Sequence, residues 1–170
     1  HTLLKVHNTN RNATEEFRYA LVPKNQDIPR GLPSDAVIIR TPVERVVLME
    51  TVYIGYMGSL DKLDKVCGAA STRYIKNPII VSGLQNGLIK EVHSGQKIDL
   101  EQIVLLTPDL ILSSTIGLGQ SISTQLERVG LPVVFTSSYM ERHPLARTEW
   151  LKFIAYFFDS ENLACLLYTS

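Results

Sequence analysis

The sequence has little of several features that mark particular classes of protein. Only two of its 170 residues are cysteines, Cys67 and Cys165, which is too few for a disulfide framework. The 17 lysines and arginines are matched by 17 aspartates and glutamates, so the excess of positive charge that a broad nucleic-acid-binding surface needs is missing. No apolar run reaches the roughly 18–20 residues that span a bilayer as a helix. These absences predict no nucleic-acid partner and no membrane-spanning segment.

The composition that remains is that of a folded domain. Hydrophobic residues make up 45% of the chain and charged residues 20%, which argues against disorder. A chain of this length forms one domain with a sizeable core and is hardly long enough for two.

The two ends of the chain do not look like natural ends. The first residue is His1 rather than Met, so a signal peptide or lipid anchor would already have been lost. Residues 163–170 carry no charge and no stop signal. We interpret the chain as a fragment whose tail, 161–170, is partly foreign to it; the alternative is a short apolar strand or tail that packs on the core.

The first 41 residues predict a small β unit. Residues 3–7, 17–22 and 36–39 have the composition of short strands. Polar and proline-rich segments separate them and indicate loops. We expect a small antiparallel β appendage over 1–41.

After Pro42, strands and helices alternate. The strands are continuous apolar runs, which is typical of a parallel sheet with helices on its faces. Asp99, with Gln102 three residues later, has the pattern of a capping box at a helix start, and Gly130 stands where a helix C-cap favours glycine. Residues 78–85 are apolar but short. The expected strands are 45–49, 65–69, 90–92, 109–113 and 132–136, and the expected helices lie near 51–60, 99–106, 119–129 and 145–158.

Ligands of such sheets bind outside the carboxyl ends of the strands. Here these ends are rich in hydroxyl groups and tyrosines, with one arginine, which suits a polar ligand or one with a planar face. The alternative is that the serines and threonines only cap the following helices. The candidate ligand-binding residues are Thr51, Tyr53, Arg73, Tyr74, Ser114, Thr115, Ser138 and Tyr139.

Other chemistry has weaker support. The segment 117–121 resembles a phosphate-binding turn but lacks a third glycine and a following acidic residue, so a nucleotide-binding enzyme domain remains an alternative. The four histidines lack metal-ligand spacing, and none is expected at a strand end of the parallel sheet, so direct binding of a bare metal ion is a further alternative. No nucleophile signature is present; we predict no catalytic residue, no metal site, no cofactor and no enzyme activity.

Five segments, in order, resemble the substrate-binding proteins of ABC importers for iron-siderophores, haem and cobalamin. The most specific is 99–111, DLEQIVLLTPDLI, which is similar to that family's helix-to-strand signature. The others are PVERVVL at 42–48, LDKLDKVCG at 60–68, GLPVV at 130–134 and ERHPLARTEW at 141–150. Two departures stand out: Asp61 replaces a family glycine, and His93 stands where the family has another, so the 71–98 loop is expected to differ.

The resemblance implies a two-lobed protein about twice this length. The chain would then contain an α/β N-terminal lobe over 42–144, a Rossmann-like parallel sheet, and the start of the inter-lobe helix over 145–160. That helix has two apolar stripes, and a lone lobe would expose them as a patch. The implied location is periplasmic or extracytoplasmic, with membrane contact only through a lipid anchor missing from this chain.

The resemblance also implies how the candidate residues act. The ligand would be a metal chelate held between the lobes. Tyr53, Tyr74 and Tyr139 would stack on or pack against it, Arg73 would pair with an acidic group, and Ser114 and Thr115 would form hydrogen bonds with it. The implied partner is an ABC permease and ATPase complex, with Glu141 as a candidate docking residue or, alternatively, a structural cap.

Overall fold

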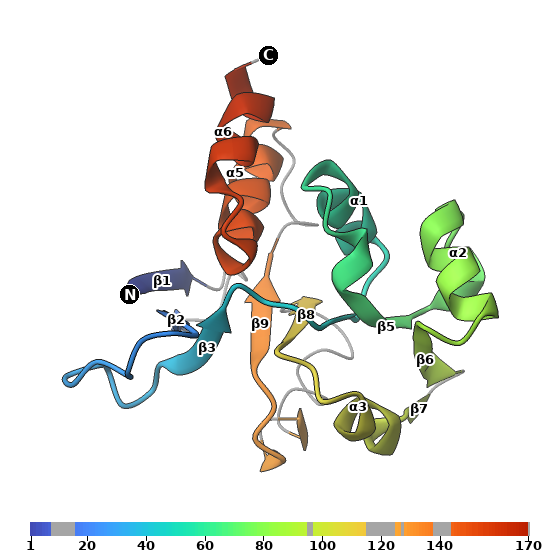
Figure 1. Cartoon of the computed structure of the whole chain (residues 1–170), viewed down its shortest axis with the longest axis horizontal. Helices are drawn as coiled ribbons and strands as arrows, with labels where there is room; N and C mark the ends of the chain where they lie inside the picture. The colour runs from blue at the N-terminus through green and yellow to red at the C-terminus, as the bar shows by residue number, and fades with distance from the viewer. Residues whose placement is uncertain (8–15, 95–96, 115–124, 127, 138–143, 170) are drawn as a thin grey trace.

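The computed structural model describes residues 1–7, 16–94, 97–114, 125–126, 128–137 and 144–169 (Figure 1). The main sheet has the order β7-β6-β5-β4-β8-β9. Strands β6, β5, β4, β8 and β9 pair in parallel, and β7 is an antiparallel edge strand. This confirms the predicted α/β class. The bounds are β4 Val46–Leu48, β5 Val66–Ala70, β6 Lys90–Ser94, β7 Lys97–Ile98, β8 Leu110–Ser114 and β9 Val133–Thr136.

Helices cover both faces of this sheet (Figure 1). Alternate residues of β4 face opposite sides, as a strand requires. Val46 and Leu48 join the core cluster that contains residues of α1 and α2, whereas Val47 joins the cluster that contains residues of α3. The helices are α1 Val52–Ser59, α2 Pro78–Gln85 and α3 Leu100–Leu106, with short 3-10 turns at η1 Leu63–Lys65 and η2 Thr72–Tyr74.

The ends of these helices follow local rules. Asp99 caps α3 as predicted, because its Oδ1 accepts from the Gln102 amide at 2.8 Å. The reciprocal half of the capping box is not needed, since the Asp99 amide donates to the Val92 carbonyl at 2.9 Å. The segment 78–85 is a helix capped by Asn77, with Pro78 in the first turn.

Two turns explain residues noted in the sequence. Asp61 has φ of +55° and follows α1, and the Lys62 amide donates to the Met57 carbonyl at 2.8 Å. This is the bonding of a Schellman motif, whose left-handed residue is usually glycine. Asp61 therefore occupies a position that favours the family's glycine. Gly130 has φ of +75°, as a C-cap glycine should.

The N-terminal sheet is mixed, which corrects the prediction that it is antiparallel. It has the order β1-β2-β3, with strands Thr2–His7, Glu16–Pro23 and Val37–Thr41. β1 and β2 are antiparallel, but β2 and β3 are parallel. A parallel pair needs a crossover of about a dozen residues, and the proline-rich segment 24–36 supplies it.

The apolar helix expected near 145–158 forms α5 Pro144–Ala155 and η4 Tyr156–Phe158. Its first stripe, which includes Leu151 and Ile154, is buried. The expected exposure of the two stripes is therefore wrong for the first, and it is wrong for the second as well. Phe153 contacts Tyr19 of β2 with ring centroids 6.3 Å apart, and it contacts Phe157 at 5.3 Å. The N-terminal sheet covers this stripe.

The C-terminal segment is a helix rather than a strand or an irregular tail. α6 spans Glu161–Thr169 and lies beside α5 (Figure 1). The turn before it is closed by Ser160, whose hydroxyl donates to the Phe158 carbonyl at 3.0 Å. Ala164 is buried, while Leu166 is exposed. Among the described residues, no helix is both long and apolar enough to cross a membrane.

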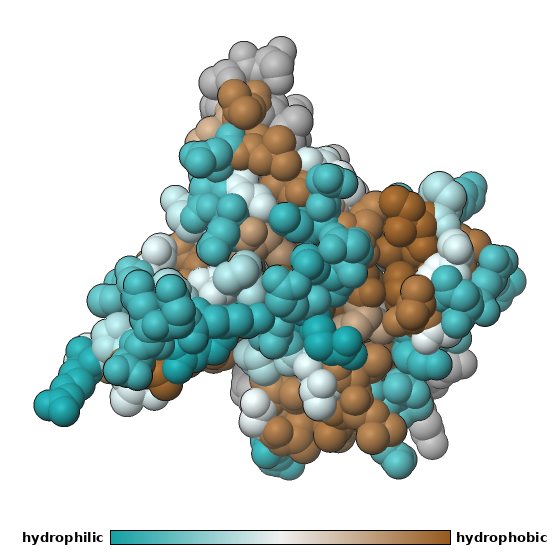
Figure 2. All heavy atoms as spheres, viewed as in Figure 1, coloured by the Kyte–Doolittle hydropathy of each residue, from teal (hydrophilic) through white to brown (hydrophobic). Residues whose placement is uncertain are grey.

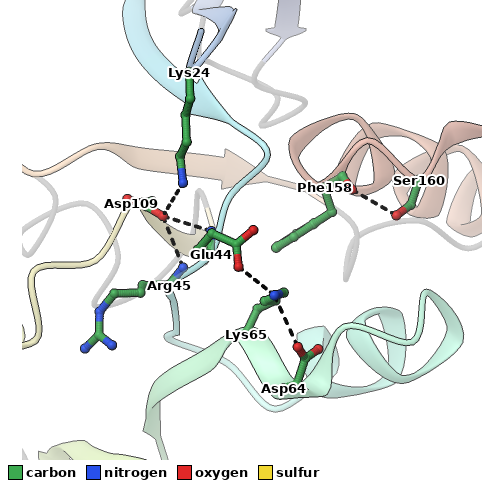
Figure 3. Close-up of polar contacts among 8 residues, drawn as sticks. All are labelled: Lys24, Glu44, Arg45, Asp64, Lys65, Asp109, Phe158 and Ser160. Carbon is green, nitrogen blue, oxygen red and sulfur yellow. Dashed lines mark hydrogen bonds and ion pairs between the residues drawn. The ribbon is translucent and has the colours of Figure 1, made fainter.

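A polar network joins the elements at the amino end of the sheet (Figure 3). Asp109 accepts from the amides of Glu44 and Arg45 at 2.8 and 3.2 Å and from Lys24 Nζ at 3.5 Å. The Arg45 guanidinium donates twice to the Leu106 carbonyl at the end of α3. The Pro-Asp turn of the signature segment therefore has a structural role.

Candidate functional site

The topology marks one position where a ligand is expected. From β4 the chain moves to β5 and β6 on one side, and it then returns to place β8 on the other side of β4. The crevice at such a reversal, outside the carboxyl ends of the strands, is where open parallel sheets bind ligands. In this chain the reversal of strand order lies between β4 and β8.

Two residues meet at this position. Glu50 follows β4, and its Oε1 accepts from the amide of Ser114, the last residue of β8, at 3.2 Å. The other oxygen, Oε2, is enclosed and has no hydrogen-bond partner among the described residues. Burial raises the pKa of Glu50, although the nearby Ser114 and Tyr53 groups partly oppose this rise. Ser114, a predicted ligand residue, therefore lies at the topological reversal.

Tyr53 lies beneath this position. Its side chain is 0% exposed, and its hydroxyl forms a 3.0 Å hydrogen bond with the Thr136 hydroxyl at the end of β9. Burial raises the pKa of Tyr53 well above its ordinary value. The expectation that Tyr53 stacks on a ligand conflicts with this burial, because the ring is already part of the core that joins β4 to β9.

Arg73 and Tyr74 project from the carboxyl end of β5. They lie on η2, directly after Ser71, which has φ of +55°. Arg73 is exposed, and Tyr74 is 73% exposed. The Thr72 hydroxyl donates to Glu91 of the neighbouring strand β6, which anchors the turn. Within the part of the chain that the structure describes, no hydrogen bond or ion pair holds the Arg73 guanidinium, so it can meet an anion.

Thr51 is the N-cap residue of α1, yet its side chain makes no capping hydrogen bond. The alternative that its hydroxyl only caps the helix is therefore wrong for Thr51. The residue is also exposed. The other predicted residues, Thr115, Ser138, Tyr139 and Glu141, lie outside the described residues, as does the turn at 117–121.

Sequence reasoning missed Glu50. The available signal was a carboxylate placed directly after a buried strand, one residue before the named candidate Thr51. Its contact with Ser114 could not be read from the sequence, because the two residues lie 64 positions apart.

Histidine placement differs from the expectation. His93 is the fourth residue of β6 and so lies near the carboxyl end of a parallel strand. The strand extends because β7 folds back on it and pairs Ile98 with His93. His93 has no positive φ, unlike the glycine expected there. Its Nε2 is buried without a partner among the described residues. Within the described ranges, no group of three or more His, Cys, Asp or Glu residues could hold a metal ion.

A separate hollow of about 460 Å³ lies elsewhere. It is lined by residues of α2 and η1 and by the residues that enter β5 and β6, such as Val66 and Ile89. Figure 2 shows apolar surface in the region of α1 and α2, where Ile79 is exposed. This hollow lies toward the amino ends of the strands and is distinct from the crevice at Glu50.

No protein-family model matches the chain. Among curated proteins it resembles two uncharacterized lipoproteins of Methanocaldococcus jannaschii. One is 26% identical over 152 residues, which are 81% of this chain and 36% of the relative. The other is 28% identical over 148 residues, which are 84% of this chain and 37% of the relative. The chain therefore spans little more than a third of the length of these relatives.

Solved structures match the fold more closely than the sequence. A periplasmic haem-binding protein of Pseudomonas aeruginosa matches with a TM-score of 0.58 and 20% identity, over 72% of this chain and 40% of that one. The petrobactin-binding protein YclQ of Bacillus subtilis matches with a TM-score of 0.58 and 19% identity, over 96% of this chain and 48% of that one. The vitamin B12-binding protein BtuF of Vibrio cholerae matches with a TM-score of 0.57 and 14% identity, over 72% of this chain and 44% of that one.

The chain has the fold of one lobe of a periplasmic binding protein. In each of these structures the matched part is less than half of the chain. The lobe fold places its polar strand ends, including Glu50 and Ser114, along a single edge of the sheet.

Proposed function

We propose that this chain is the N-terminal lobe of an extracytoplasmic substrate-binding protein that delivers a metal chelate to an ABC importer. The observation that carries this proposal is the match of the lobe to periplasmic binding proteins for haem, petrobactin and vitamin B12. The lipoprotein names of the curated relatives support a location outside the cytoplasm with a lipid anchor. The ligand class is an iron-siderophore, haem or cobalamin-type chelate.

Binding in this proposal needs no chemical step. The lobe presents its strand ends as half of a cleft, and a second lobe closes over the chelate, which shifts the population toward the closed state. The exposed Arg73 and Tyr74 form one side of this half-cleft. Ser114 and Thr51 lie at the ends of the central strands β8 and β4. Thr115, Ser138 and Tyr139 remain proposed contacts, and Glu141 a proposed docking residue.

Arg73 has the most specific role. Its guanidinium projects from η2 without a partner among the residues described, and guanidinium groups bind carboxylates through paired hydrogen bonds. We assign it to an acidic group of the chelate. Tyr74 beside it offers a ring face to the chelate's planar part.

The test is a binding series on the full-length protein that contains this lobe. Calorimetry with a panel of ferric siderophores, haem and cobalamin should find at least one ligand of micromolar affinity or better. Arg73→Ala should then weaken an acidic ligand by about 10-fold or more, since a charge-assisted hydrogen bond is worth about 1.5–3 kcal/mol.

The matched control is Lys76→Ala, which removes another exposed positive charge three residues away. It should leave the affinity within about twofold of the wild type, because Lys76 lies after η2 and has no proposed contact with the ligand. Equal affinity of the wild type and Arg73→Ala for every acidic chelate would remove Arg73 from the site. Failure of the whole panel to bind would contradict the proposed function.

A further inference from the structure

One buried acidic group has no role in the proposal above. We propose that Glu50 accepts a hydrogen bond or positive charge from the bound chelate, and that it selects chelates carrying a protonated amine or another N–H or O–H donor. The inference rests on the proposed function and adds a chemical requirement for the ligand.

The position of Glu50 is the first argument. It follows β4, which has β5 on one side and β8 on the other, and its side chain accepts from the Ser114 amide on β8. The pair therefore lies at the reversal of strand order where a ligand is expected. The residue as a whole is partly exposed, whereas its Oε2 atom is enclosed.

The second argument is the missing donor. The Ser114 amide donates a hydrogen bond to Oε1, but Oε2 is enclosed with no hydrogen-bond partner among the described residues. An enclosed acceptor without a donor is unfavourable because it has lost its water, and the cost is larger when the acceptor is charged. A ligand group that donates to Oε2 would remove this cost.

The contrast with other carboxylates is the third argument. Glu16 and Asp35 bind Arg18, Glu44 binds Lys65, and Asp109 accepts from two amides and Lys24. These groups lie at the N-terminal sheet or the amino end of the main sheet and are already paired. Over the described ranges, Glu50 is the carboxylate at the carboxyl edge that is enclosed and has no cationic partner.

The chemistry of the missing partner follows from the site. The Tyr53 hydroxyl lies near Glu50 and shares a hydrogen bond with the Thr136 hydroxyl, and no donor among the described residues reaches Oε2. An ammonium group has three donors and no acceptor, and it would also neutralise the carboxylate. A ligand that carried only carbonyl or carboxylate oxygens would leave Oε2 unpaired or repel it.

The experiment compares two probes that differ at one group. Ferrioxamine B is a ferric trihydroxamate that ends in a protonated amine, and its N-acetyl derivative lacks that charge. Affinities are measured for the full-length protein, for Glu50→Gln and for the control Glu44→Gln. Glu44 is an exposed residue that precedes β4, at the amino ends of the strands. Its substitution removes the same charge at a distance from Glu50.

The wild type and Glu44→Gln should prefer the amine-bearing probe by about 10-fold or more, and Glu50→Gln should lose that preference. The melting temperature of Glu50→Gln should not fall, which separates a loss of contact from a loss of fold. Equal affinity of the wild type for the two probes, or an unchanged preference in Glu50→Gln, overturns the inference.

If neither probe binds, the same three proteins are tested with the best-binding chelate of the panel. A loss of about 10-fold or more in Glu50→Gln alone supports the inference, and unchanged affinity overturns it while leaving the proposed function intact. If no chelate binds, both the inference and the proposed function fail.

Discussion

Two neighbouring side chains at the carboxyl edge of the main sheet have different partners. Tyr53 and Glu50 are three residues apart, but the tyrosine is buried against Thr136 whereas the glutamate reaches Ser114. Their residue types alone suggested an aromatic ligand contact and gave no prediction for the carboxylate. The structure makes Glu50 the stronger candidate of the two. Burial removes Tyr53 from the surface and leaves one oxygen of Glu50 without a donor among the described residues.

The buried carboxyl of Glu50 should make stability depend on pH. Its pKa in the folded state is raised from the ordinary value of 4.5. Below that value both states bind the proton, and the contribution of Glu50 to stability is greatest. Above it the unfolded state ionises first, so the free energy of unfolding falls with rising pH until Glu50 itself ionises. Urea unfolding of the chain over a pH series from about 4 to about 8 measures the decline.

Glu50→Gln should remove this contribution, since glutamine does not titrate. The variant should lose part of the decline and should be at least as stable as the wild type at neutral pH. A variant with the same pH dependence as the wild type would show that Glu50 is not the group responsible.

At the scale of elements, local signals predicted helix and strand types well where a capping pattern or a continuous apolar run was recognised. The capped helix α3 and the apolar strands β4, β5, β8 and β9 were predicted close to their observed ranges. The short segment 78–85 received no assignment, although Asn77 caps it as a helix. Its short apolar run shows no clear helical period, so packing against Ile89 and the sheet decides its state.

Two helical glycines should respond differently to alanine. Nothing lies within 4 Å of the place that a Cβ would take at Gly55 in α1, whereas a Cβ at Gly83 in α2 would lie 2.5 Å from Ile89 Cδ1. Gly55→Ala should raise the free energy of unfolding by up to about 1 kcal/mol, through helix propensity alone. Gly83→Ala should lose that gain and destabilise by about 1–2 kcal/mol, because the methyl group overpacks the contact.

Chemical denaturation of both variants against the wild type makes this comparison. Both substitutions replace glycine with alanine, and both lie in helices of eight residues. Each variant is therefore the control for the other. A stabilising Gly83→Ala would mean that Ile89 moves away without cost and that the close approach of α2 to β6 is not required.

At the scale of the whole molecule, the N-terminal strands are part of the core rather than an attached unit. Tyr19 is 1% exposed, and its hydroxyl accepts from the Phe135 amide of β9 at 2.9 Å. Phe17 contacts Phe135 with ring centroids 4.8 Å apart. The aromatic stripe of α5 is covered because these strands lie against it.

Removal of residues 1–41 should therefore expose the Phe153 and Phe135 faces. We expect the shortened chain to bind the dye ANS and to associate, which dye fluorescence and light scattering measure. A monomeric product without dye binding would show that residues 42–170 fold independently, as a separate domain at 42 would require.

Tyr19→Phe is the milder control in the same contact. It keeps the ring but leaves the Phe135 amide without its acceptor, which should cost about 1–3 kcal/mol. No change in stability would mean that the amide finds another partner. The two variants together separate the packing of the N-terminal sheet from its buried hydrogen bond to β9.

The sequence by itself determined the alternation of strands and helices, the capped start of α3, and the order of motifs that pointed to a binding-protein lobe. These depend on periodicity and capping, which act over a few neighbouring residues. Only the tertiary structure decided that β3 runs parallel to β2, that the N-terminal sheet covers α5, and that Glu50 meets Ser114. Those contacts join residues as far apart as 64 and 116 positions, and their geometry depends on how the whole chain packs.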